Sequence, residues 1–199
     1  MRTAARLGTV LAGLLLAAGC SPAPSPAPAG HTHPAPTEPG AGDLARVLLA
    51  TADAQDVAAA EARGYASTLK TLGCFQDPAR GGMGLHYLNA KLLDDRVQAQ
   101  APEALVYELK SDGTVAGLVA LEYIVPVEAW HDTKPPELFG MAFHKHATLP
   151  LYVLHLWVWK ANVSGMFADF NPAVRQCPAN VPIFGRDLPK PPASTPPGR

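Results

Sequence analysis

The chain has 199 residues, and 16 basic against 17 acidic side chains leave it almost neutral, with a net charge of −1. Lysines and arginines form no cluster, so the composition disfavours nucleic acid as a partner. More than half of the 21 prolines lie in residues 21–40 and 186–199. The part of the chain between them has the size of one ordinary domain.

The N-terminus predicts export. Residues 1–19 carry two arginines, an apolar stretch and small residues directly before Cys20. The apolar stretch is too short to span a bilayer as a helix. The segment resembles a bacterial lipoprotein signal, in which the cysteine is acylated and becomes the first residue of the mature chain. Acyl chains on Cys20 would hold the protein on a membrane of the bacterial cell envelope. The alternative is ordinary cleavage near Ala18, which would leave Cys20 as a spare thiol.

Two proline-rich segments flank the predicted domain. Residues 20–42 contain almost no large apolar side chain and are expected to form a disordered, semi-extended tether. Residues 186–199 have a similar composition and are expected to be a disordered tail. Residues 43–185 are therefore expected to form a single globular domain.

Two cysteines remain inside the domain. Cys74 and Cys177 form an even pair in a chain that is expected to reach an oxidising compartment, so a disulfide between them is predicted.

The domain begins with a helical pattern and continues with strands. Apolar residues recur at helical spacing from Asp43, a plausible N-cap, to Gly64, a plausible C-cap, which predicts one helix or two short ones. Four later segments are rich in Val, Leu, Tyr and Trp, and turn-forming residues bound them. They are residues 83–89, 104–110, 117–125 and 151–160. An Asp-Gly turn joins the second and third as a hairpin, and the whole predicts an α+β fold with a mainly antiparallel sheet.

Three of these strands contain an ionisable residue among apolar ones. His155 lies in the last strand, Glu122 interrupts the third and His86 the first. Alternation places His155 on one face with Trp157 and Trp159. A buried carboxylate without a partner costs several kcal/mol, so adjacent strands are expected to bring the three together.

Two imidazoles and a carboxylate can hold zinc, iron or copper and leave positions open for water or substrate. Glu108 is expected nearby, and Trp157 and Trp159 could wall a pocket. In the alternative interpretation the cluster is free of metal, and Glu122 accepts hydrogen bonds from the imidazoles and from Tyr87 or Tyr123. Such a network would only fix the register of the strands.

The other histidines are weaker candidates. His144 and His146, like His31 and His33, have a spacing that can bind Cu(II) or Zn(II) loosely, and His131 fits an exposed loop. That loop, residues 128–150, is long enough to suggest a function or ordering by its own aromatic contacts.

The motifs GMGLHY, PEALVYE, LEY and LHLWVWKANVSGMFADFNPAVRQCP resemble a family of secreted bacterial proteins of uncharacterised function. The resemblance covers about residues 45–178. The family usually has Asn-Pro-x-Gly and Trp-Asn-Pro where this chain has residues 162–165 and 170–172. The resemblance implies a secreted single domain and no particular activity.

Three functions are compatible with these observations. The chain could be an envelope lipoprotein that binds a metal ion or a small ligand. It could be a metal-dependent enzyme in which His86, Glu122 and His155 hold the ion. It could also be a structural or interaction protein with an inert polar cluster. Hydrolase, kinase and thioredoxin-like motifs are absent from the sequence.

Overall fold

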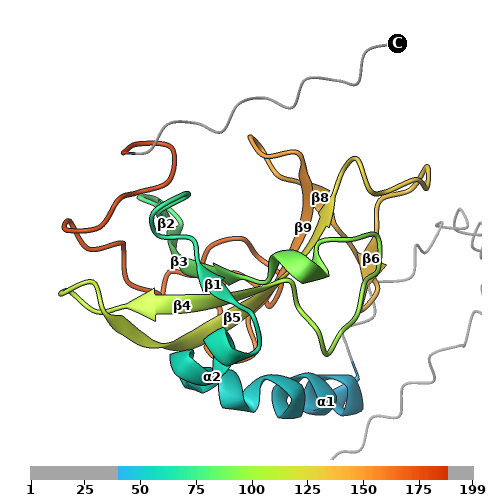
Figure 1. Ribbon diagram of the computed structural model, residues 1–199, viewed down its shortest axis with the longest axis horizontal. Coiled ribbons are helices and arrows are strands. Elements are labelled where there is room, and N and C mark those ends of the chain that lie inside the picture. Colours follow the sequence, from blue (N-terminus) through green and yellow to red (C-terminus); the bar gives the residue numbers. More distant parts are fainter. Residues whose placement is uncertain (1–39, 188–199) are drawn as a thin grey trace, which may run out of the picture. The chain divides into compact units, whose positions relative to one another are not determined.

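The computed structural model describes residues 40–187 (Figure 1). Its main element is a seven-stranded sheet in the order β1-β3-β4-β5-β9-β8, in which β2 also pairs with β3. The elements in chain order are α1 (Ala41–Thr51), η1 (Ala52–Gln55), α2 (Val57–Ala62), β1 (Ala66–Ser67), β2 (Cys74–Asp77), β3 (Gly81–Leu88), η2 (Ala90–Leu92), β4 (Ala104–Leu109), β5 (Val115–Pro126), β6 (Glu137–Leu138), β7 (Met141–Ala142), β8 (His144–Lys145) and β9 (Leu151–Leu156). The predicted α+β fold is confirmed. The signal, Cys20, His31, His33, the tether up to residue 39 and the tail from residue 188 lie outside the described residues.

The helical segment consists of two short helices joined by a 3-10 turn. Helix α1 begins at Ala41 after Gly40, so the prediction of Asp43 as its N-cap, and of a tether reaching residue 42, is wrong. Asp56 caps α2, because its side chain accepts a hydrogen bond from the amide of Ala58. Gly64 follows α2 with a φ of +97°, the left-handed conformation that commonly ends a helix.

The four predicted strands are β3, β4, β5 and β9, and β4 and β5 form the predicted hairpin. Strand β9 ends at Leu156, however, so the expectation that it continues to residue 160 is wrong. No pattern in the sequence indicated the short strands β1, β2, β6, β7 and β8. Every pair of named strands is antiparallel.

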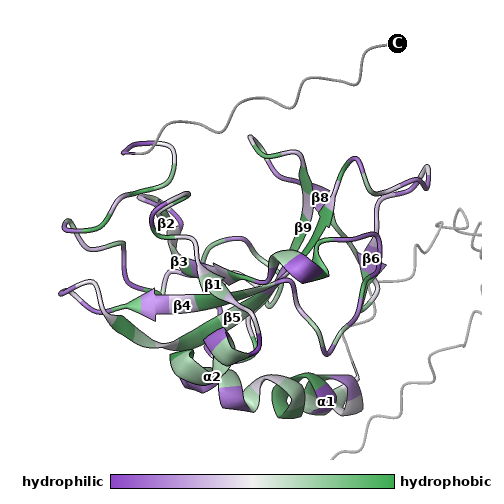
Figure 2. Cartoon of the chain, viewed as in Figure 1, coloured by the Kyte–Doolittle hydropathy of each residue, from purple (hydrophilic) through white to green (hydrophobic). Residues whose placement is uncertain are grey.

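One face of the sheet packs against the helices. Tyr107 and Tyr123 project from this face, and the Tyr107 hydroxyl donates a hydrogen bond to the carbonyl of Ala54. Figure 1 shows α1 and α2 lying together along this face, and Figure 2 shows the apolar colouring of the strands above them. Alternation along each strand then places the neighbouring residues, including His86 and Glu122, on the opposite face.

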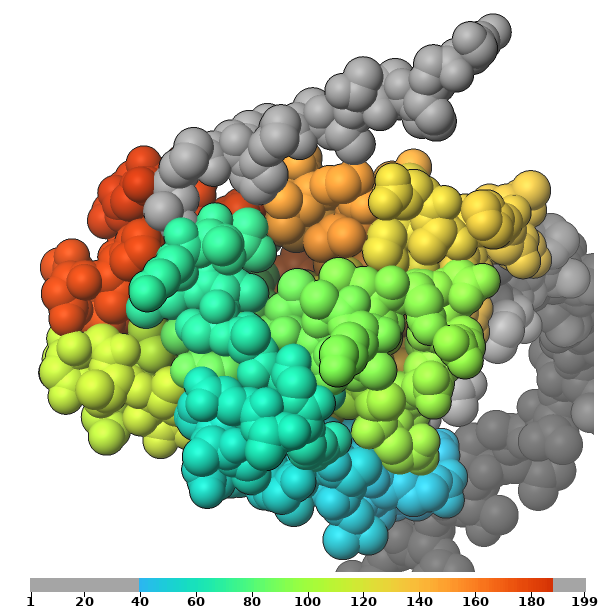
Figure 3. Space-filling model, viewed as in Figure 1, coloured from blue at the N-terminus to red at the C-terminus, as the bar shows by residue number. Residues whose placement is uncertain are grey.

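The opposite face is covered by β2 and by segments from the C-terminal third of the domain. Phe75 of β2 stacks on Phe184, and Val174 belongs to the same buried cluster. In Figure 3 these teal and red segments lie side by side at the surface. The Cys74–Cys177 disulfide joins them across 103 residues, which confirms the predicted bridge. Such a bridge is compatible with an exported protein. No helix within residues 40–187 is long and apolar enough to cross a membrane.

Candidate metal centre

His86, Glu122 and His155 come together on the face of the sheet that lies away from the helices. Glu122 pairs with His155 across β5 and β9, whereas β4 separates Glu122 from β3, which carries His86. The Nε2 atom of His86 lies 3.2 Å from Oε2 of Glu122, and Nε2 of His155 lies 3.5 Å from Oε1. All three residues are buried, with His155 only 1% exposed. The predicted convergence of the three side chains is confirmed.

Two glycines before His86 allow the chain to pack closely at this point. A Cβ atom on Gly82 would lie 2.3 Å from the carbonyl oxygen of Arg175, and one on Gly84 would lie 2.5 Å from that of Tyr107. Gly84 also has a φ of +121°, which side-chain-bearing residues rarely adopt. The GMG motif therefore lets β4 and the C-terminal segment lie directly against β3, next to the candidate site.

The surroundings of Glu122 favour the ionised form of its carboxyl group. Its burial acts to raise the pKa, but the imidazoles of His155 and His86 outweigh burial and lower the pKa to about 2. A buried carboxylate of this kind needs positive charge beside it. Two imidazoles can supply that charge as imidazolium ions, and a bound cation can supply it when they are neutral.

Asp169 is a further member of the site that the sequence analysis missed. Its Oδ1 atom lies 3.4 Å from Nδ1 of His155 and 3.2 Å from Nε2 of His144. These neighbours hold the pKa of Asp169 well below its usual range, and the carboxylate in turn raises the pKa of His144. His155 therefore lies between two carboxylates, one at each ring nitrogen. Asp169 is the lone ionisable residue in the run Met166–Phe170, the same signal that singled out Glu122.

The buried nitrogens of the site lack aligned hydrogen bonds. Both ring nitrogens of His155, Nδ1 of His86 and Oδ1 of Asp169 have no hydrogen-bond partner among the described residues. The contacts between His155 and the two carboxylates are close enough for electrostatic attraction, but they do not have the geometry of hydrogen bonds. Buried polar atoms in native proteins are rarely left in this state.

The three donors have the chemistry of a transition-metal site. Two imidazole nitrogens and one carboxylate oxygen lie within 4.8 Å of one another. Zinc bound to four donors at ~2.0–2.1 Å keeps neighbouring donors roughly 3.4 Å apart, so modest side-chain movement would complete the site. Histidine pairs with one carboxylate hold zinc in hydrolases and iron(II) in oxygenases.

Several residues that were expected near the cluster lie elsewhere. Glu108 is on the same face of the sheet, but its carboxylate binds the Lys160 ammonium at 2.8 Å and does not reach the cluster. Tyr87 and Tyr123 lie on the helix side, since each follows a site residue directly in its strand. The hydrogen bond from Tyr87 or Tyr123 to Glu122 in the alternative interpretation is therefore wrong, because both rings lie on the helix side and the Tyr123 hydroxyl donates to the carbonyl of Ala99.

Trp157 and Trp159 lie on different sides of the sheet, because strand β9 ends before them. Trp157 is buried on the site's side of the sheet and lies parallel to the His155 ring, with 6.5 Å between ring centroids. Trp159 packs on the helix side, where its indole nitrogen donates to the hydroxyl of Thr51. The prediction that Trp159 shares a face with His155 is wrong.

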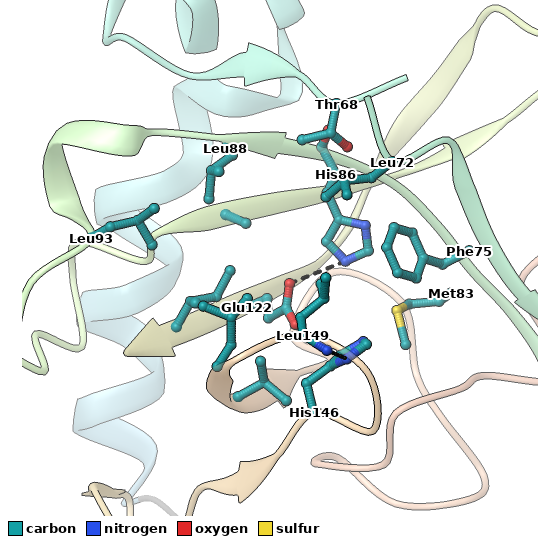
Figure 4. A pocket seen from close by; sticks show the side chains of 14 residues that line it. Thr68, Leu72, Phe75, Met83, His86, Leu88, Leu93, Glu122, His146 and Leu149 are labelled. Atoms are coloured by element: carbon teal, nitrogen blue, oxygen red, sulfur yellow. Dashed lines mark hydrogen bonds and ion pairs between the residues drawn. The ribbon is translucent and has the colours of Figure 1, made fainter. Parts of the chain in front are cut away.

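A cavity of about 70 Å³ opens beside the cluster. His86 and Glu122 form part of its wall (Figure 4). Phe75 and Met83 lie beside His86, and His146 and Leu149 also line the cavity. Val153 lies in the wall of this cavity and also of a neighbouring surface cleft that reaches His155 and Asp169. His146 thus lines the site, whereas His131 is exposed in its loop.

Comparison of the chain with family models, with curated proteins and with solved structures finds no match. The function is therefore inferred from the geometry and chemistry of these residues.

Proposed function

We propose that this chain is an exported, lipid-anchored envelope protein whose domain binds a divalent transition metal ion. His86, Glu122 and His155 supply two nitrogens and one oxygen to the ion. Zinc and iron(II) suit this donor set best. The resemblance of several motifs to secreted bacterial proteins agrees with export, as does the Cys74–Cys177 disulfide.

The main support for the proposal is that His155 is buried without aligned hydrogen bonds. Its ring is 1% exposed, and neither nitrogen has an aligned hydrogen bond among the described residues. In an inert cluster His155 would have to be buried as an imidazolium ion, because one nitrogen of a neutral imidazole would face a carboxylate without a proton between them. A cation bound at Nε2 supplies the positive charge in its place, and Nδ1 keeps its proton and donates it toward Asp169. Carboxylate, histidine and metal are commonly arranged in this order in metalloproteins.

The site would hold the ion on a rigid support. Glu122 and His155 are paired residues on adjacent strands, and His86 lies in the strand one place beyond β4. The three protein donors leave at least one coordination position for water or another ligand, where a bound ion can act as a Lewis acid.

Metal analysis of the protein tests the proposal. The exported protein, purified from the envelope of a bacterial host without chelators, is expected to contain close to one equivalent of zinc or iron. His155→Ala should lose that metal, whereas His131→Ala, which changes an exposed histidine of the same domain, should keep it. Absence of metal from the unchanged protein after incubation with excess zinc and with excess iron(II) would overturn the proposal and favour an inert polar cluster.

A further inference from the structure

The cavity beside the candidate metal centre has an almost entirely apolar wall. Besides His86 and Glu122 it is formed mainly by leucine, isoleucine, valine, phenylalanine and methionine side chains. They include Leu72, Leu93, Ile124 and Leu151. Figure 4 shows the Glu122 carboxylate and the His86 ring facing each other among these side chains.

The remaining polar groups of the wall are mostly engaged. The hydroxyl of Thr68 donates to the carbonyl oxygen of His86 at 3.0 Å. Nδ1 of His146 accepts hydrogen bonds from the amides of Thr148 and Leu149 at 3.2 and 3.1 Å. Burial also lowers the pKa of His146, so its ring is a poor source of positive charge. The wall therefore offers little to a ligand with several polar groups or a free charge.

A small residue in the sheet helps to create this space. Ala104 of β4 is fully buried, pairs with both Glu122 and Leu88, and lies in the wall of the cavity. A larger side chain at this position would project from the same face of the sheet as Glu122, into the space beside its carboxylate.

We infer that this cavity admits a small, uncharged molecule of about two to four carbons with a single oxygen donor, such as a short-chain alcohol or carbonyl compound. The inference rests on the proposed function, since the donor atom would take an open position on the metal. Its size follows from the volume of about 70 Å³, because an apolar cavity of about 150 Å³ accepts benzene. A carboxylate is disfavoured because its second oxygen would face an apolar wall that has no lysine or arginine among the described residues.

Fluorine NMR with cobalt(II) in place of the native metal tests the inference. Cobalt stoichiometry is measured first. The probe is 2,2,2-trifluoroethanol at low millimolar concentration, whose fluorine signal broadens when it exchanges near the paramagnetic ion. The unchanged protein with one equivalent of cobalt is expected to broaden the signal, and excess 1-propanol should reverse the effect, whereas propionate should not. The zinc-loaded protein gives the diamagnetic reference.

Ala104→Leu is the matched variant, because it fills the cavity and leaves all three donor residues unchanged. It should still bind one equivalent of cobalt and reduce the broadening at least fivefold; Ala104→Val is the milder substitution if the leucine variant does not fold. Equal broadening in a folded, cobalt-loaded variant would overturn the inference, as would no broadening by the cobalt-loaded unchanged protein. Failure to bind cobalt, zinc or iron would overturn the proposed function itself, and the inference with it.

Discussion

Replacement of Asp169 by asparagine should weaken metal binding, although Asp169 is not one of the three donors. In the structure its carboxylate has two imidazole neighbours, His155 Nδ1 at 3.4 Å and His144 Nε2 at 3.2 Å. If His155 binds the ion through Nε2, Asp169 orients the ring and increases its basicity. Loss of such a partner costs roughly 10- to 100-fold in metal affinity. That range corresponds to about 1.4–2.7 kcal/mol.

The assay is a competition titration with a fluorescent zinc chelator at neutral pH. Asp169→Asn should raise the dissociation constant within the stated range, whereas Asp132→Asn, which alters an exposed aspartate, should leave it unchanged. His144→Gln removes only the other neighbour of Asp169 and should change the constant less than threefold. Circular dichroism establishes that each variant is folded. An affinity within twofold of the unchanged protein for a folded Asp169→Asn variant would refute the assigned role of Asp169.

Three further predictions concern the stability of the fold. The Cys74→Ser/Cys177→Ser double variant should lose up to about 4.7 kcal/mol in urea unfolding, because the bridge spans 103 residues; a loss below about 1 kcal/mol would contradict this. Burial raises the pKa of Glu103 to about 7 from 4.5. The free energy of unfolding of the unchanged protein should therefore fall by up to ~3 kcal/mol relative to that of Glu103→Gln as pH rises from about 4.5 to 7. Equal pH dependence would contradict that. Gly84→Ala places a Cβ atom 2.5 Å from a backbone oxygen of β4 and should cost ~1–3 kcal/mol or more in urea unfolding. Gly165→Ala is the control, because Gly165 has a similar φ but lies in open space, and it should cost less. An equal loss of stability in the two variants would count against crowding at Gly84.

The sequence was enough to predict the fold class because its long strands have strong patterns. Residues 83–89, 104–110 and 117–125 combine β-branched and aromatic residues with clear turns, and they became β3, β4 and β5. The two-residue strands β6 and β7 have no such pattern, since so short a segment takes its conformation from its neighbours. The aromatic content of Trp157 and Trp159 favoured a longer β9, but the chain turns away from the sheet after Leu156.

The cluster could be predicted in part for a physical reason. His86, Glu122 and His155 each stood alone in an apolar strand, and buried charges need partners. The same reasoning applied to Asp169, but its segment has no strand pattern, and no periodicity indicated where its side chain would point. Glu108 is the opposite case, because it was expected near the cluster but its partner is Lys160, which lies 52 positions away in the sequence. Contacts that depend on where a loop packs against the domain cannot be predicted from the spacing of residues in the sequence.

The most direct test of the metal centre is anomalous X-ray diffraction from crystals of the protein grown with zinc, recorded on both sides of the zinc absorption edge. An ion bound by the three donors should give one strong anomalous peak within ~2.0–2.2 Å of Nε2 of His86, a carboxylate oxygen of Glu122 and Nε2 of His155. No peak among these three side chains, or a peak only at surface histidines such as His131, would contradict it.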